Sequence, residues 1–266
     1  MSVLDPFDFS GRVAVITGAG TGIGRAAARL FSERGADIVL AGRKLEPLQE
    51  TAAMVEAVGR KATVVQTDVK DAEACEALVA KAMEAHGRID YLVNNAGGSR
   101  SKSLTKWQLK DFDDMIALNL RSVWILSMAA APHMREGGGG SIVNISSGAS
   151  LYPVPPSAAY GVAKAGVNNM TAVMAVDMAS WNIRVNCIAP GTVKSECYVR
   201  AMHVAGRNPD ETSASNPSQR GGEPDDIAWP ILFCCSNVTA GWMSGQTIHV
   251  AGGPAGWKKP PPIHDV

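Results

Sequence analysis

Seven short runs rich in β-branched residues, separated by longer segments with helical periodicity, constrain the fold of this chain most strongly. The segments between the runs, such as 45–59 and 71–87, place apolar residues at helical spacing and end in a glycine. Repeated strand–helix–strand order predicts a parallel sheet covered by helices on both faces, and right-handed crossovers make it a doubly wound α/β fold. The expected strands span residues 12–17, 37–41, 62–66, 89–95, 141–146, 183–189 and 246–250.

The chain is expected to form a single domain over residues 1–266, because no linker or internal repeat divides its apolar pattern. Its 25 basic and 25 acidic residues balance, so no electrostatic footprint indicates nucleic acid or an anionic membrane as a partner. Residues 1–12 contain two aspartates and no apolar leader, which favours a cytoplasmic protein. The five cysteines are scattered without metal-ligand spacing, so neither disulfides nor a metal site are expected.

A glycine-rich turn, TGAGTGIG at 17–24, follows the first expected strand and leads into a helical segment. Glycine lets the backbone approach a pyrophosphate closely, and a helix N-terminus supplies free N–H groups and a partial positive charge. The turn therefore predicts a dinucleotide site, although a glycine-rich connection that binds nothing is the alternative. The pattern is not GxGxxG, since Ile23 stands where a third glycine is needed.

The second strand ends in LAGRK, which places Arg43 about 20 residues beyond the glycine turn. A site selective for NAD would have an acidic residue there, on the ribose 2′-hydroxyl. An arginine suits a 2′-phosphate by charge and by its forked donor geometry, so NADP(H) is favoured over NAD(H). The alternative is a solvated basic turn, because Thr21 in the glycine turn is not basic.

Five motifs in one order and spacing carry a family resemblance. They are TGAGTGIG at 17–24, NNAG at 94–97, ISS at 145–147, YGVAK at 160–164 and PGTVKS at 190–195. With them the chain resembles a classical short-chain dehydrogenase/reductase, a Rossmann-like fold, over residues 10–253.

The resemblance implies the roles of particular residues. Asn119, Ser147, Tyr160 and Lys164 correspond to the family's catalytic tetrad, with Asn119 in a water-mediated proton relay to Lys164. The alternative for Asn119 is a helix asparagine bonded to backbone. Ala251 departs from the family, which commonly has aspartate there. The positions matching the family's cofactor contacts are Gly18, Gly20, Thr21, Gly22, Ile23, Gly24, Arg43, Asp68, Val69, Asn95, Ala96, Gly97, Tyr160, Lys164, Pro190, Gly191, Val193 and Ser195.

Tyr160 and Lys164 share one helix face because they stand four residues apart. Interconverting a carbonyl and an alcohol moves a proton, and a free tyrosine is too weak an acid at a pKa of about 10. The cation of Lys164 is expected to lower the pKa of Tyr160. Ser147 is expected to be a second donor to the substrate oxygen, and its spacing to Tyr160 favours it over Ser146. Without Ser147, the spacing of Tyr160 and Lys164 would indicate no more than an exposed helix face.

Four further features bear on substrate and assembly. Residues 196–222 are expected to form a substrate loop or lid, and 254–266 a polar tail. The basic segment 99–106 could meet an acidic or phosphate-bearing substrate tail, or be a solvated loop. A stripe after Tyr160 indicates a homodimer or homotetramer, unless it packs only on its own sheet. The stripe consists of Ala163, Gly166, Met170 and Met174.

These features predict an NADP(H)-dependent oxidoreductase that interconverts a small-molecule carbonyl and a secondary alcohol. Reduction of the double bond of an enoyl thioester is a second enzyme reading. A nucleotide-binding regulator without turnover is a third, which has no need of an activated tyrosine.

Overall fold

One seven-stranded parallel sheet runs through the molecule in the order β3-β2-β1-β4-β5-β6-β7. The computed structural model describes residues 5–155, 157–204, 206–213 and 216–256, so most of the expected tail lies outside the described residues. The doubly wound prediction is confirmed, and every predicted strand is present within two residues of its bounds. The strands are β1 (Val13–Thr17), β2 (Asp37–Gly42), β3 (Ala62–Gln66), β4 (Tyr91–Asn94), β5 (Gly140–Ile145), β6 (Ile183–Pro190) and β7 (Thr247–Val250).

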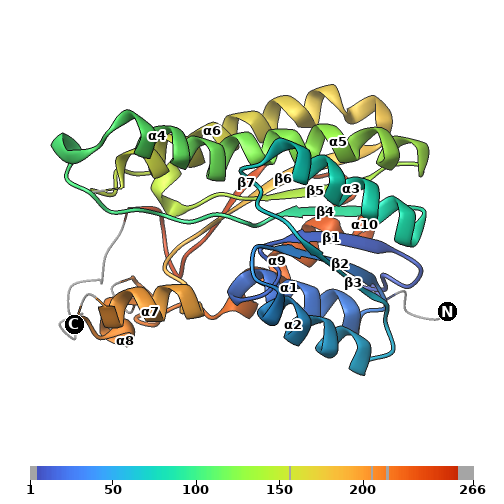
Figure 1. Ribbon diagram of the computed structural model, residues 1–266, viewed down its shortest axis with the longest axis horizontal. Coiled ribbons are helices and arrows are strands. Elements are labelled where there is room, and N and C mark those ends of the chain that lie inside the picture. Colours follow the sequence, from blue (N-terminus) through green and yellow to red (C-terminus); the bar gives the residue numbers. More distant parts are fainter. Residues whose placement is uncertain (1–4, 156, 205, 214–215, 257–266) are drawn as a thin grey trace, which may run out of the picture.

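Helices cover both faces of the sheet (Figure 1). One face carries α1 (Gly22–Glu33), α2 (Leu45–Ala57) and α9 (Pro224–Cys235). The other carries α3 (Ala72–His86), α4 (Leu109–Ile116), α5 (Ser122–Glu136) and α6 (Ala158–Asp177). The short helices are α7 (Glu196–Val204), α8 (Pro209–Ser213) and α10 (Asn237–Ala240). Single turns occur at Leu104–Lys106, Gly148–Ser150 and Ala179–Trp181, and a π-helical turn at Ala117–Arg121.

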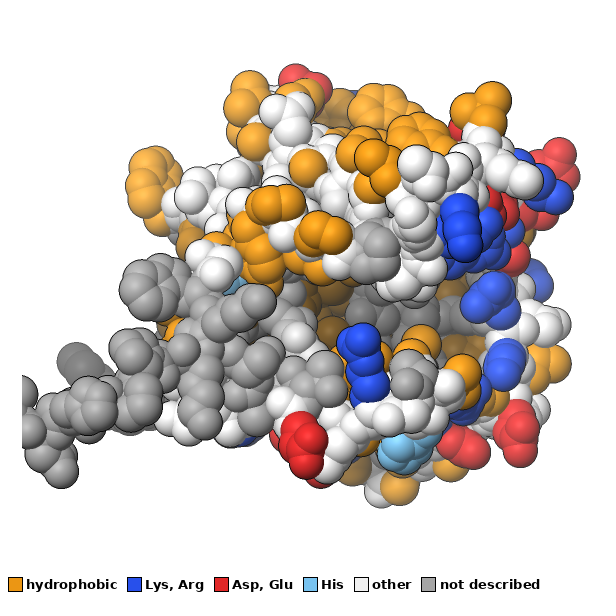
Figure 2. All heavy atoms as spheres, turned by 90° about the vertical axis from the view of Figure 1, so that its left-hand side faces the viewer, with side chains coloured by type: hydrophobic (Ala, Val, Ile, Leu, Met, Phe, Trp, Pro, Cys, Tyr) orange, Lys and Arg blue, Asp and Glu red, His pale blue; other side chains and the backbone are white. Residues whose placement is uncertain are grey.

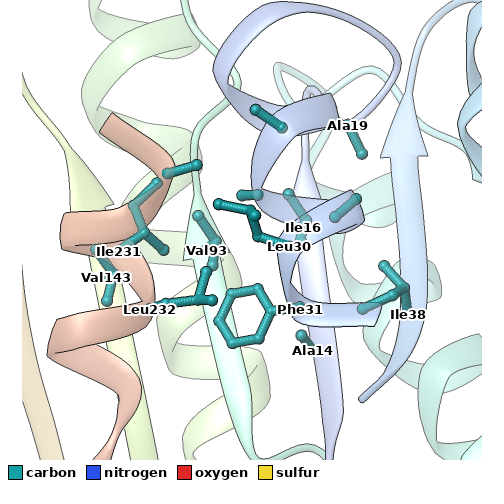
Figure 3. Close-up of a cluster of buried hydrophobic side chains, with 14 of the residues drawn as sticks. Ala14, Ile16, Ala19, Leu30, Phe31, Ile38, Val93, Val143, Ile231 and Leu232 are labelled. Carbon is teal, nitrogen blue, oxygen red and sulfur yellow. The ribbon is translucent and has the colours of Figure 1, made fainter. Parts of the chain in front are cut away.

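The core beneath α1 and α9 fixes the first strand–helix unit (Figure 3). Phe31 of α1 is fully buried between the sheet and α9, and its ring lies 5.0 Å from that of Phe9. Pro224 begins α9 at its first turn, and Cys234 and Cys235 at the end of the same helix are buried. Close packing of this kind resists small displacements, so the strand ends above it are held in place.

Asp90 ties together the amino ends of β1 and β4, at the opposite edge of the sheet from the glycine turn. Its carboxylate accepts hydrogen bonds from the Val13 N–H at 2.9 Å and from Arg12 and Arg88 at 2.6–2.9 Å. Although burial opposes ionisation, these donors together lower the pKa of Asp90. The ionised carboxylate therefore stabilises the fold well away from the candidate site.

The helical run Leu109–Glu136 is long and apolar enough to cross a membrane by length and composition, with a mean hydropathy of 1.3 over its best window. Here it packs on the sheet, where Met115, Val123, Leu126 and Met134 are buried. Helices on the core of globular domains have the same composition.

Two predictions about local structure need correction. The segment 196–222 is not simply a loop, because α7 and α8 form within it. The stripe on α6 faces inward: Ala163 and Met174 are buried, and Gly166 lies against Leu120. The stripe therefore packs inside its own chain, close to the alternative that it packs only on its own sheet, except that Gly166 meets a helical turn and not the sheet.

Candidate active site

The expected site residues gather where the carboxyl ends of the parallel strands meet. The face on the left-hand side of Figure 1 is hollowed across its middle in Figure 2, and Lys and Arg side chains gather at one end of the hollow. Open α/β sheets bind ligands at this edge.

The glycine turn is so tightly packed that side chains have no room in it. A Cβ on Gly24 would lie 2.2 Å from the Gly18 carbonyl oxygen, and one on Gly18 would lie 2.8 Å from Nδ2 of Asn95. Gly18 and Gly22 also have φ values of +65° and +53°, which favour glycine. Asn95 donates from Nδ2 to the Thr17 carbonyl at 2.8 Å. The NNAG segment therefore packs against the glycine turn and holds it in place through Asn95.

The N-terminus of α1 already holds an anionic group. Thr21 caps the helix in an extended conformation without a side-chain cap hydrogen bond. The N–H of Gly22 donates to Oε2 of Glu196 at 2.7 Å, and Nη1 of Arg25 lies 3.8 Å from Oε1 of the same carboxylate. A helix N-terminus whose N–H groups donate to a carboxylate can also donate to a phosphate oxygen. Sequence reasoning missed Glu196, whose one signal was its place directly after Ser195.

Residues from β2 and β3 border the adenine end expected from the resemblance. Arg43 follows β2 and has an exposed side chain. Its carbonyl accepts a hydrogen bond from Nε2 of Gln66 at 2.9 Å, which ties the two strand ends together. Asp68 accepts from the Lys70 N–H at 3.0 Å, while Val69 is buried.

The chain after β6 closes against the glycine turn. Pro190 ends the strand, and a Cβ on Gly191 would lie 2.5 Å from Cβ of Ala251, so the small residue at the position departing from the family packs closely there. Val193 forms an isolated parallel bridge with Gly222. Ser195 is the near neighbour of Gly22, whose Cβ would lie 2.9 Å from that of Ser195.

Helix α6 presents Tyr160 and Lys164 together at the end of β5. Lys164 is only 3% exposed, and its Nζ donates to the Ile145 carbonyl at 2.7 Å. The same nitrogen lies 5.8 Å from the centre of the Tyr160 ring. Burial lowers the pKa of Lys164 from 10.5 to about 8, because removal from water disfavours the ammonium.

Burial raises the pKa of Tyr160 from 10, because removal from water disfavours the phenolate, and the nearby Ser147 hydroxyl acts less strongly in the opposite direction. The pKa of Tyr160 is therefore raised in the protein alone, where the sequence predicts that Lys164 lowers it, and burial is the cause. Ser146 is buried and donates to the Lys164 carbonyl at 3.0 Å, so it supports α6. Ser147 is the serine beside the phenol.

Asn119 lies in the π-helical turn with its side chain fully buried. Its Oδ1 accepts from the Gly98 N–H at 3.0 Å, and its Nδ2 donates to the Gly98 and Met115 carbonyls at 3.0 and 3.1 Å. The structure thus shows the backbone-bonded asparagine, and the proton relay stays a prediction. A Cβ on Gly97 would lie 2.8 Å from Oδ1 of Asn119 and 3.3 Å from Nζ of Lys164. Asn119 therefore holds the NNAG segment against the lysine.

The basic segment 99–106 meets acidic side chains of its own chain. Arg100 lies 3.3 Å from Asp111 and 3.6 Å from Asp114, and Lys102 also pairs with Asp111. These contacts offset its charge locally, which favours the solvated-loop reading over a phosphate-binding one.

Comparison with known proteins places this geometry in a family. Residues 12–203 match the short chain dehydrogenase family. An uncharacterized oxidoreductase of Thermotoga maritima is 39% identical over 251 residues, which cover 92% of this chain and 98% of that protein. L-sorbose reductase from Gluconobacter frateurii, solved with NADPH and L-sorbose, superposes with a TM-score of 0.90 at 30% identity and covers 95% of this chain and 100% of its own.

A second solved structure is a 7α-hydroxysteroid dehydrogenase in complex with NADH and 7-oxo glycochenodeoxycholic acid. It superposes with a TM-score of 0.88 at 32% identity and covers 96% of this chain and 98% of its own. The chain therefore belongs to the short-chain dehydrogenase family, oxidoreductases that use a nicotinamide cofactor and act on the CH–OH group of small molecules.

Proposed function

We propose that this enzyme uses NADP(H) to interconvert a ketone and a secondary alcohol. The observation that carries the proposal is the cluster of Ser147, Tyr160 and Lys164 at the strand ends, beside the glycine turn. The turn suits a dinucleotide because its glycines stand where a Cβ would clash and because the Glu196 carboxylate, an anionic group, already accepts from the N-terminus of α1.

The bound cofactor supplies or accepts the hydride, and the chain's own residues handle the proton. In reduction, the Tyr160 phenol donates its proton to the substrate oxygen, and the Ser147 hydroxyl stabilises the developing charge there. A buried phenol with a raised pKa stays protonated at neutral pH, as this direction requires. Lys164, with a pKa of about 8, gains or loses a proton close to neutral pH and can restore the proton of Tyr160.

The preference for NADP(H) rests on Arg43, whose exposed side chain at the end of β2 suits a 2′-phosphate. The solved relatives contain NADH in one case and NADPH in the other, so family membership does not decide the cofactor. Titration of nicotinamide fluorescence should show NADPH binding at least about tenfold more tightly than NADH. Arg43→Ala should remove that margin, whereas Arg60→Ala, at the amino end of β3, should keep it. Equal affinity of the wild type for both nucleotides would refute the choice.

Turnover separates an enzyme from a nucleotide-binding regulator. A screen with NADPH would include L-sorbose, 7-oxo glycochenodeoxycholic acid and a simple enoyl thioester, the last to test double-bond reduction. Tyr160→Phe should abolish ketone reduction while NADPH still binds. A Tyr160→Phe enzyme that keeps its ketone turnover would remove Tyr160 from the chemistry.

We also propose a homo-oligomer, because α5 and α6 expose an apolar face. Trp124, Val162, Val173 and Val176 are 49–77% exposed on these two helices. Large apolar side chains exposed on neighbouring elements are typical of association sites. Light scattering after gel filtration should give a dimer or tetramer that Val176→Glu dissociates. Val204→Glu, at a comparably exposed valine on α7, is the control and should leave the mass unchanged.

A further inference from the structure

A third polar side chain follows Tyr160 and Lys164 along α6. Asn168 stands one helical turn beyond the lysine and lies partly buried between α6, β6 and the turn Gly148–Ser150. Its Nδ2 donates to the Ser150 hydroxyl at 2.8 Å. Its Oδ1 faces the thiol of Cys187 in β6, with the sulfur 3.6 Å away. Asn169, the next residue, is exposed.

Ser150 passes this contact on to Ser147. The Ser150 hydroxyl donates to the Ser147 carbonyl at 2.6 Å, and the Ser150 N–H donates to the same oxygen at 3.0 Å. At the other side of Ser147, its hydroxyl accepts from the Ala149 N–H at 3.2 Å. The backbone of Ser147 is therefore held by the short turn Gly148–Ser150, and Asn168 stabilises this turn through its hydrogen bond to Ser150.

The hydrogen bonds from Cys187 through Asn168 and Ser150 to Ser147 can all form at once, because each group donates or accepts as its neighbour requires. Burial raises the pKa of Cys187 to about 11, so the sulfur remains a thiol and its S–H donates to Oδ1 of Asn168. With Oδ1 towards the thiol, Nδ2 of the same amide faces the Ser150 hydroxyl. Ser150 accepts from the amide and is free to donate its own proton to the Ser147 carbonyl.

We propose that Asn168 is a positioning residue, which acts through Ser150 to hold Ser147 in hydrogen-bond reach of Tyr160. This inference rests on the proposed function, since it gives Asn168 a purpose only if Ser147 and Tyr160 share a substrate oxygen. Small errors in the placement of a catalytic group are costly, and a serine hydroxyl on a short turn moves with its backbone. The Ser147 hydroxyl also acts to lower the pKa of Tyr160, so its displacement leaves a measurable trace on the phenol.

The test follows the ionisation of Tyr160 directly, in protein saturated with NADP⁺. Tyrosinate absorbance near 295 nm is recorded against pH, and the curve of Tyr160→Phe is subtracted to isolate Tyr160. In Asn168→Ala the midpoint should move upward by roughly half a unit to one unit, the effect of one lost hydrogen bond. Ser150→Ala should move it in the same direction, and Asn169→Ala, the matched control, should not move it.

A double variant decides whether Asn168 acts through Ser147. The single variant Ser147→Ala should raise the midpoint of the Tyr160 titration. Adding Asn168→Ala to it should raise that midpoint no further. Midpoints of Asn168→Ala and wild type that coincide would overturn the proposal, as would additive shifts in the double variant. If the shifts appear as expected but no ketone or alcohol turns over, the proposed function fails while the positioning role stands. Where a substrate is found, Asn168→Ala should lower kcat and leave the Kd for NADPH unchanged.

Discussion

Replacing Lys164 by methionine should stabilise the protein while it abolishes activity. Burial lowers the pKa of this lysine from 10.5 to about 8, which corresponds to an unfavourable contribution of about 3 kcal/mol at pH 7. Methionine has similar length and no charge to desolvate. The variant loses the bond from Nζ to the Ile145 carbonyl, at a cost of about 1 kcal/mol. We expect a net gain in the free energy of unfolding of roughly 2 kcal/mol at pH 7.

The stability difference between wild type and Lys164→Met should depend on pH, and its sign follows from the lowered pKa of Lys164. A base with a lowered pKa in the folded state binds fewer protons there than in the unfolded chain, so the wild type gains stability as pH rises from about 8 towards 10.5. The advantage of Lys164→Met should therefore shrink by roughly 2–3 kcal/mol between pH 7 and pH 10. The raised pKa of Cys187, about 11, makes the folded state less stable as pH rises through this range, but wild type and variant both contain Cys187, so comparing the two proteins removes its contribution.

Urea unfolding of wild type and variant at the two pH values measures this difference. Lys106→Met, at an exposed lysine, is the control and should change stability by a similar small amount at both pH values. A gain for Lys164→Met that is equal at pH 7 and pH 10 would refute the reasoning, as would a loss of stability at pH 7.

Further predictions concern the glycine turn and the far edge of the sheet. Gly24→Ala should weaken NADPH binding by roughly tenfold or more, seen by fluorescence titration, because its methyl group would meet the Gly18 carbonyl. Glu196→Gln should tighten NADPH binding by about two- to fivefold at low salt, since it removes a negative charge at the N-terminus of α1, and Glu50→Gln should not. Weaker binding by Glu196→Gln would show that the carboxylate helps to hold the nucleotide. Asp90→Asn should lower the free energy of unfolding by about 2–4 kcal/mol at pH 7, measured with urea. Because the pKa of Asp90 is lowered, that difference should fade only as pH drops below about 4.

The strands and the glycine turn could be predicted because their signals are local. The five inner strands are short apolar runs that are largely buried on both faces, and such runs are recognisable without knowing their neighbours. Gly18, Gly22 and Gly24 likewise sit where a side chain does not fit, which restricts the residue type at each position.

The remaining contacts join residues that no local pattern links. Glu196 accepts from the N-terminus of α1 although it is far from it in the sequence, and Asn168 connects β6 to the turn that follows Ser147. The sequence predicts a loop where α7 forms, because the second half of the segment 196–222 is rich in Ser, Asn and Pro. The helical spacing in the first half of that segment is the weaker signal. The raised pKa of Tyr160 depends on the depth of its burial, which sequence spacing does not show.

The contact between Gly22 and Glu196 also bears on how the protein is made. These residues are 174 positions apart in the chain, yet the second covers the turn formed by the first. At a synthesis rate of about 5–20 residues per second, the glycine turn leaves the ribosome roughly ten seconds or more before its cover exists. A nascent chain that ends before β6 carries the turn and α1 but lacks the segment that closes over them. Nucleotide capture by this enzyme is thus expected to be a late event in biosynthesis, after almost the whole sheet has assembled.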